Sequence, residues 1–121
     1  FWFVRGDVFN SDEYSKYIKL ASKIINKFNG KFLVRGGTQT EFEQQGYSRT
    51  VVIEFNSYQE ALDCYQSDEY QKALKIVKIS AKRLVVIIRR IEFKRLIIKS
   101  KNACFDMFKK ILIFFNKSVD M

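Results

Sequence analysis

Three ionisable residues stand inside segments that resemble β-strands, and their types suit the binding of an anion. Arg5, Arg35 and Glu54 each lie in a run rich in aromatic and β-branched residues. If the three strands are neighbours, two guanidiniums flank one carboxylate, and one positive charge remains to bind a carboxylate or phosphate in bidentate fashion. The competing interpretation is a structural ion-pair cluster that keeps the strands in register.

The same residues limit the chemistry that an enzyme could perform here. The chain contains no histidine, which removes the most common general base and the most common metal ligand. The candidate catalytic residues are then Glu54 and Tyr70, either of which could move a proton. A glutamate between two arginines should stay ionised, which favours a ligand clamp over a general acid. Whether the protein is an enzyme at all stays open.

Four further residues are candidates for contact with a ligand. Gly36 and Gly37 follow Arg35 and could bring backbone N–H groups close to a ligand, although a bulge or turn is the commoner role of such a pair. They lack the surroundings of a nucleotide-binding loop. Ser67 is expected to cap a helix, and Tyr70, one turn further on, either packs in the core or points into a pocket.

The composition excludes several classes of protein. Two cysteines, Cys64 and Cys104, make neither a disulfide framework nor a zinc site, and we expect no metal and no cofactor. Reduced thiols suit a cytoplasmic protein, and no signal peptide is visible after Phe1. The apolar fraction of 47% is that of a folded chain.

The net charge of +9 would suit a nucleic-acid partner, but its distribution does not. Residues 1–92 contain 15 Lys/Arg and 11 Asp/Glu, whereas residues 93–121 contain 7 Lys/Arg and 2 Asp/Glu. More than half of the excess therefore belongs to a basic tail. That tail could be a packed helix, an amphipathic helix at a membrane surface or a segment without structure. Binding to nucleic acid or to a membrane is expected, if at all, only through residues 93–121.

The spacing of apolar and capping residues predicts an alternation of strands and helices. Asn10 or Ser11 starts the first helix, with Glu13 placed for a capping box on Asn10, and Asn29-Gly30 ends it. Ser57 and Ser67 open two more helices. Residues 38–43 could extend the second strand before a turn at 44–48. The expected strands span 1–8, 31–35, 49–55 and 84–91, and the last helix spans 68–78.

This order is the βαββαβ pattern of ferredoxin-like α+β domains. Right-handed crossovers then give a four-stranded antiparallel sheet with strand order 4-1-3-2 and the helices on one face. Alternation assigns an uncharged set to that covered face, including Leu84, Val86 and Ile88 of the last strand. The other face mixes apolar residues with Arg5, Arg35 and Glu54. Because water would otherwise reach its apolar residues, we expect this face to pack on a second copy.

The motifs resemble those of domain-of-unknown-function family 1330 over residues 1–88. The resemblance rests on V-R-G-D-V at 4–8, the run F-L-V-R-G-G at 32–37, V-I-E-F at 52–55 and Y-x-S-x-x-Y at 65–70. It implies a small bacterial homodimer, a dimeric α/β barrel, with no established activity. Related barrels include cofactor-free monooxygenases and isomerases, an analogy of fold that transfers no chemistry. Members usually stop after the fourth strand, so residues 93–121 depart from the pattern.

Three hypotheses follow for the function of the chain. The first is a homodimer that binds a small organic anion between its sheet and its partner, through Arg5, Arg35, Gly36, Gly37, Glu54, Ser67 and Tyr70. The second is a structural or regulatory dimer without a ligand. The third is a polyanion or membrane binder that uses the basic tail.

Overall fold

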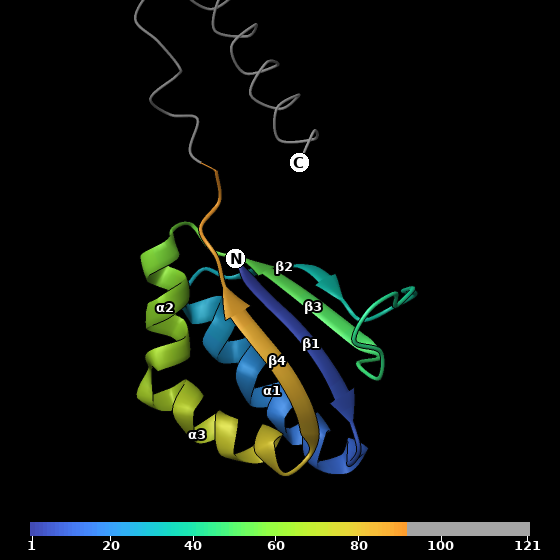
Figure 1. Cartoon of the computed structure of the whole chain (residues 1–121). Coiled ribbons are helices and arrows are strands. Elements are labelled where there is room, and N and C mark those ends of the chain that lie inside the picture. The colour runs from blue at the N-terminus through green and yellow to red at the C-terminus, as the bar shows by residue number, and fades with distance from the viewer. Residues whose placement is uncertain (92–121) are drawn as a thin grey trace, which may run out of the picture. The chain divides into compact units, whose positions relative to one another are not determined.

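The computed structural model describes residues 1–91, and the basic tail that the sequence analysis singled out lies outside the described residues. Four strands form one antiparallel sheet in the order β2-β3-β1-β4 (Figure 1). Read from the other edge, this is the predicted order 4-1-3-2. The strands are β1 (Trp2–Val8), β2 (Lys31–Arg35), β3 (Arg49–Glu54) and β4 (Ala81–Ile87).

Three helices cover one face of the sheet, and each begins at a predicted cap. They are α1 (Ser11–Lys27), α2 (Tyr58–Gln66) and α3 (Asp68–Lys78). The side chains of Asn10, Ser57 and Ser67 accept a hydrogen bond from the backbone N–H three residues further on, which satisfies donors that have no partner within the helix. None of these helices is long and apolar enough to cross a membrane.

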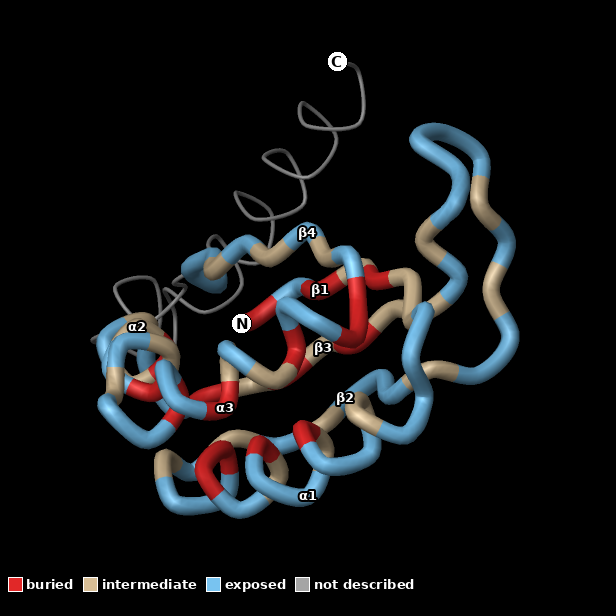
Figure 2. Tube along the Cα trace, turned by 90° about the horizontal axis from the view of Figure 1, so that it is seen from below, coloured by how far each residue is buried: buried red, intermediate tan, exposed pale blue. Residues whose placement is uncertain are grey.

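The core lies between the sheet and the helices, where the buried positions of both layers face one another (Figure 2). Trp2 is its centre: its ring packs against Phe55, Tyr65 and Tyr70, with centroids 5.0–5.6 Å apart. The indole Nε1 donates a hydrogen bond to the carbonyl oxygen of Ala61, 2.9 Å away. A buried tryptophan needs such a partner, so this bond helps to fix α2 against β1.

Two predictions about strands are wrong, and the first of them changes which side chains face the helices. The last strand begins at Ala81 rather than Leu84, and the pairs Val4–Val85 and Gly6–Arg83 put odd-numbered residues of β4 under the helices. Leu84, Val86 and Ile88, which were assigned to the covered face, are 43–55% exposed. Residues 38–43 belong to the loop that joins β2 to β3 and do not extend the strand.

The bulge in β2 produces a second change of face. Phe32 lies opposite Ile53, but Val34 lies opposite Val52 and Arg35 opposite Val51. Because directly opposite residues share a face of the sheet, Val34 turns to the open face. Arg35 turns to the helix-covered face, where the sequence predicted no charge. One extra residue in a strand has this effect because the side-chain period is two.

Gly30 connects α1 to β2 at a point where no side chain fits. A Cβ atom there would lie 2.5 Å from Cγ2 of Ile25 and 2.9 Å from Cε1 of Phe55, both in the core. We therefore expect Gly30→Ala to lower the free energy of unfolding by about 1–3 kcal/mol through overpacking, as measured by urea denaturation. Adding Ile25→Leu, which removes Cγ2, should recover part of the loss. Additive losses in the double variant would contradict this explanation.

Candidate functional site

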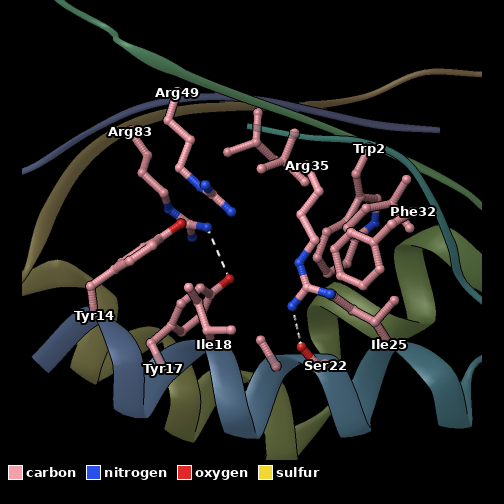
Figure 3. Close-up of a pocket in the computed structure, with 14 residues that line it drawn as sticks. Trp2, Tyr14, Tyr17, Ile18, Ser22, Ile25, Phe32, Arg35, Arg49 and Arg83 are labelled. Atoms are coloured by element: carbon pink, nitrogen blue, oxygen red, sulfur yellow. Dashed lines mark hydrogen bonds between the residues drawn. The ribbon is translucent and has the colours of Figure 1, made fainter. Parts of the chain in front are cut away.

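The candidate site is a pocket between the sheet and α1 that opens to solvent (Figure 3). Three arginines line it, each from a different strand. Arg35 ends β2, Arg49 begins β3, and Arg83 lies near the start of β4. The face that the sequence analysis expected to be free of charge therefore holds three guanidiniums.

The strand register explains why two of these arginines lie near each other. Gly6 of β1 pairs with Arg49 on one side and with Arg83 on the other, so the two long side chains leave the sheet on either side of a residue without one. A Cβ atom at Gly6 would already touch Cγ of Arg83 at 3.4 Å. A larger side chain would take the space that the arginine stems occupy.

Gly36 packs directly on Arg49. Its φ of +71° belongs to the left-handed region, which glycine adopts at little cost. A Cβ atom there would overlap Nη1 of Arg49. The N–H of Gly36 donates to the carbonyl oxygen of Thr50, 2.9 Å away, so it continues the pairing with β3 and does not face a ligand. Gly36 positions a pocket arginine instead.

Each guanidinium has different partners. Nη2 of Arg35 donates to Oγ of Ser22 on α1 at 2.8 Å. Arg83 donates to two phenol oxygens, from Nη1 to Tyr17 at 3.0 Å and from Nη2 to Tyr70 at 3.2 Å. Nε of Arg49 is buried without a hydrogen-bond partner among the described residues.

No carboxylate balances these three charges within the part of the chain that the structure describes. Every ion pair there, up to a nitrogen–oxygen distance of 4.0 Å, involves other residues. The pocket lining includes no Asp or Glu. Arg49 and Arg83 are partly buried, whereas Arg35 is exposed. A positive charge that is partly removed from water loses hydration and gains from a nearby anion. The pocket is therefore suited to an anion from outside the described chain.

The walls of the pocket are apolar and aromatic. Trp2, Ile25 and Phe32 close one side, and Tyr14 and Tyr17 of α1 form the other (Figure 3). The pocket has a volume of about 40 Å³. A water needs roughly 10–15 Å³ by this measure, so the pocket has room for about three waters. That is the size of a single carboxylate or phosphate group.

The hydroxyls of Tyr17 and Tyr70 stay protonated at neutral pH. Burial raises the pKa of Tyr17 well above its ordinary value, and the adjacent Tyr70 raises it further. Burial likewise raises the pKa of Tyr70, although Arg83 opposes that shift. Burial also raises the pKa of the Cys64 thiol to about 12, which makes it a packing residue rather than a nucleophile. Within residues 1–91 no three His, Cys, Asp or Glu side chains lie together as a metal site.

The predicted cluster of Arg5, Arg35 and Glu54 does not form. Glu54 lies opposite Lys31, and its Oε2 is 3.1 Å from Nη2 of Arg90. Arg5 is on the open face but donates to Oε1 of Glu41 at 3.0 Å and to the carbonyl oxygen of Gln44 at 2.9 Å. It therefore holds the loop between β2 and β3 on the sheet. Of the three residues, only Arg35 lines the pocket, and it does so from the opposite face.

The other predicted site residues do not line the pocket. Ser67 caps α3 and donates to the carbonyl oxygen of Cys64 at 2.7 Å. Gly37 has a φ of +91° and no atom within 4 Å of a Cβ built on it. Tyr70 is fully buried behind Tyr17, whose hydroxyl oxygen is 2.7 Å from its own. Neither candidate catalytic residue, Glu54 or Tyr70, lines the pocket.

Sequence reasoning missed Arg49, Arg83 and Tyr17 as site residues. Strict alternation through residues 49–55 places Arg49 with Val51 and Ile53 on the covered face, so that signal was present. Arg83 was not identified as a site residue because the predicted last strand begins at Leu84, after the polar pair Lys82-Arg83. Tyr17 fits the apolar face of a helix as well as a site, and no spacing separates the two roles.

Comparisons with known proteins agree on the fold. Two crystal structures of RPA0582, a protein of unknown function from Rhodopseudomonas palustris, are similar to this chain, and the second is of the methylated protein. Their TM-scores are 0.57 and 0.56, and the sequence identity is 10% in both comparisons. Each match covers 75% of this chain and 82% or 81% of the other. None of the curated proteins with which the chain was compared matches it. The family model described as domain of unknown function (DUF1330) matches residues 1–91, and the chain belongs to that family.

Proposed function

We propose that this domain binds a small organic anion in the pocket between its sheet and α1. The observation that supports this is the set of three guanidiniums, Arg35, Arg49 and Arg83, which line one pocket with no carboxylate within 4.0 Å among the described residues. A planar guanidinium binds a carboxylate or phosphate through two parallel hydrogen bonds. The buried, unpartnered Nε of Arg49 provides a donor for such an anion.

The size and the walls of the pocket limit the kinds of ligand that could bind. The pocket has room for one anionic group, so we expect the rest of a larger ligand to extend out of its mouth past aromatic and apolar side chains. Among the lining residues there is no histidine or carboxylate that could accept a proton at neutral pH. This favours a binding role, or a reaction in which the ligand supplies its own base, over general acid–base catalysis by the protein.

Binding of an anion should depend on Arg49 more than on an arginine elsewhere. We expect sulfate or a small carboxylate, at about ten times its Kd, to stabilise the protein by about 1.4 kcal/mol, a rise in Tm of several degrees for a domain of this size. Arg49→Met should weaken binding about tenfold to a hundredfold, because it removes charge-assisted hydrogen bonds. Thermal-shift titration and calorimetry measure both effects.

Two control variants separate the pocket from general effects of charge and salt. Arg89→Met removes the same charge at an exposed position outside the pocket, and it should leave binding unchanged. Arg5→Met tests the open face instead. Sulfate also stabilises proteins by exclusion from their surfaces, so a shift of equal size in all variants would contradict a site. Loss of binding in Arg5→Met alone would locate the anion on the open face.

Without an anion, the same Arg49→Met change should not destabilise the fold. It removes a partly buried positive charge that has no carboxylate within 4.0 Å among the described residues, and a methionine stem can still pack near Tyr14, over whose ring the guanidinium lies at 5.8 Å. Residues kept for binding are often replaceable at no cost in stability. We expect an unchanged or higher free energy of unfolding in low-salt buffer, measured by urea denaturation. A loss above about 1 kcal/mol would indicate that Arg49 has a structural role.

We also propose that the open face of the sheet pairs with a second copy of the chain. Phe3, Leu84, Val86 and Ile88 are 39–55% exposed there, and no helix among residues 1–91 covers them (Figure 1). An apolar patch of this kind usually meets a partner. Charged groups of both signs, Asp7 opposite Lys82 and the Arg5–Glu41 pair, border the patch. A face with an apolar centre and mixed charges can complement itself across a two-fold axis.

The oligomeric state in solution tests this pairing. Multi-angle light scattering of the full chain should give the mass of a dimer, and Val86→Glu should give a monomer because it places a charge at the centre of the patch. Ile79→Glu changes an equally exposed residue at the end of α3 and should remain dimeric. A monomeric wild-type protein, or a dimer that tolerates Val86→Glu, would exclude the open face as the interface.

A further inference from the structure

Two tyrosines and an arginine form a closed hydrogen-bonded group at one wall of the pocket. The hydroxyl oxygens of Tyr17 on α1 and Tyr70 on α3 are 2.7 Å apart, and Arg83 of β4 donates to both. Tyr17 is 6% exposed and Tyr70 is fully buried. Only Tyr17 and Arg83 reach the pocket lining. Tyr70 stands behind them.

One of the two hydroxyl protons of Tyr17 and Tyr70 has no acceptor within this group. A guanidinium only donates hydrogen bonds, whereas a phenol both donates and accepts. Arg83 therefore uses an acceptor site on each hydroxyl oxygen. The two hydroxyls carry two protons, and their mutual hydrogen bond uses one. The other proton has no acceptor among the hydrogen bonds of the described residues.

Burial decides which tyrosine holds the remaining proton. If Tyr17 donated to Tyr70, the proton of Tyr70 would be left in the core without an acceptor, which is unfavourable for a buried polar group. If Tyr70 donates to Tyr17, the free proton belongs to Tyr17 and is directed into the pocket. Both groups stay neutral, since their pKa values are raised, and the other charged groups of this pocket are the arginines Arg35 and Arg49.

We propose that Tyr17 donates its hydroxyl proton to the bound anion and thereby selects a bare, unprotonated oxygen beside Arg83. The inference rests on the proposed anion site. It names the chemistry at one point of that site: a carboxylate, sulfate or doubly ionised phosphate oxygen fits there, because both neighbours donate. A protonated oxygen, an amide nitrogen or an ammonium group at the same point would face two donors and no acceptor.

Sulfate is the probe for this inference because it carries no proton at neutral pH. Calorimetry on the full chain should give a Kd about tenfold higher for Tyr17→Phe than for the wild type, the effect expected for one hydrogen bond to a charged group. Tyr65→Phe is the matched control: it removes the same atom from a tyrosine that does not line this pocket and has no hydrogen bond to Tyr17 or Arg83, and it should change Kd by no more than about threefold.

A second readout does not depend on the variants being folded. In wild-type protein labelled at tyrosine Cζ, carbon NMR should show that the Tyr17 signal moves most among the six tyrosines as sulfate saturates, since its hydroxyl gains an acceptor. An unchanged Kd in Tyr17→Phe, or a Tyr17 signal that does not respond, would overturn the inference while leaving the anion site in place. A wild-type protein that does not bind sulfate would overturn both.

Discussion

The pairing of Gly6 with an arginine on each side is the constraint on which the site depends. In an antiparallel sheet, directly opposite residues share a face, so a register that buries Trp2 and Val4 of β1 also sends Arg49 and Arg83 under the helices. These side chains cannot be turned outward without exposing the core. The charge in the pocket is therefore a consequence of the same register that builds the hydrophobic core.

The two faces of the sheet differ in whether their charged side chains form ion pairs. On the open face, Arg5 pairs with Glu41 and Glu54 pairs with Arg90. These contacts hold the loop between β2 and β3 and the segment that follows β4. On the covered face, the side-chain hydrogen bonds of Arg35 and Arg83 among the described residues go to neutral hydroxyls, those of Ser22, Tyr17 and Tyr70. A structural ion-pair cluster would contain its own counter-charges. Their absence from the described part of the covered face favours the proposed anion site over a purely structural role.

Much of the fold could be predicted from the sequence because its local signals agree with one another. Capping residues at Asn10, Ser57 and Ser67 locate the helices, and the order of elements gives the sheet topology. The candidate site was harder to predict because it depends on which face of the sheet each side chain occupies, and a shift of one residue reverses that face. The bulge after Phe32 moved Arg35 to the other face. Both alternating rows of β4 are largely apolar, so hydropathy alone could not decide its register.

The most direct test of the account is to locate a bound anion by diffraction. Crystals of the full chain grown with selenate, at a concentration that saturates binding in solution, would show the anion through the anomalous scattering of selenium. The account predicts a peak under the sheet, within hydrogen-bond distance of the guanidiniums of Arg49 and Arg83 and of the Tyr17 hydroxyl. A pocket without a peak, or selenate bound only on the open face beside Arg5, would contradict it.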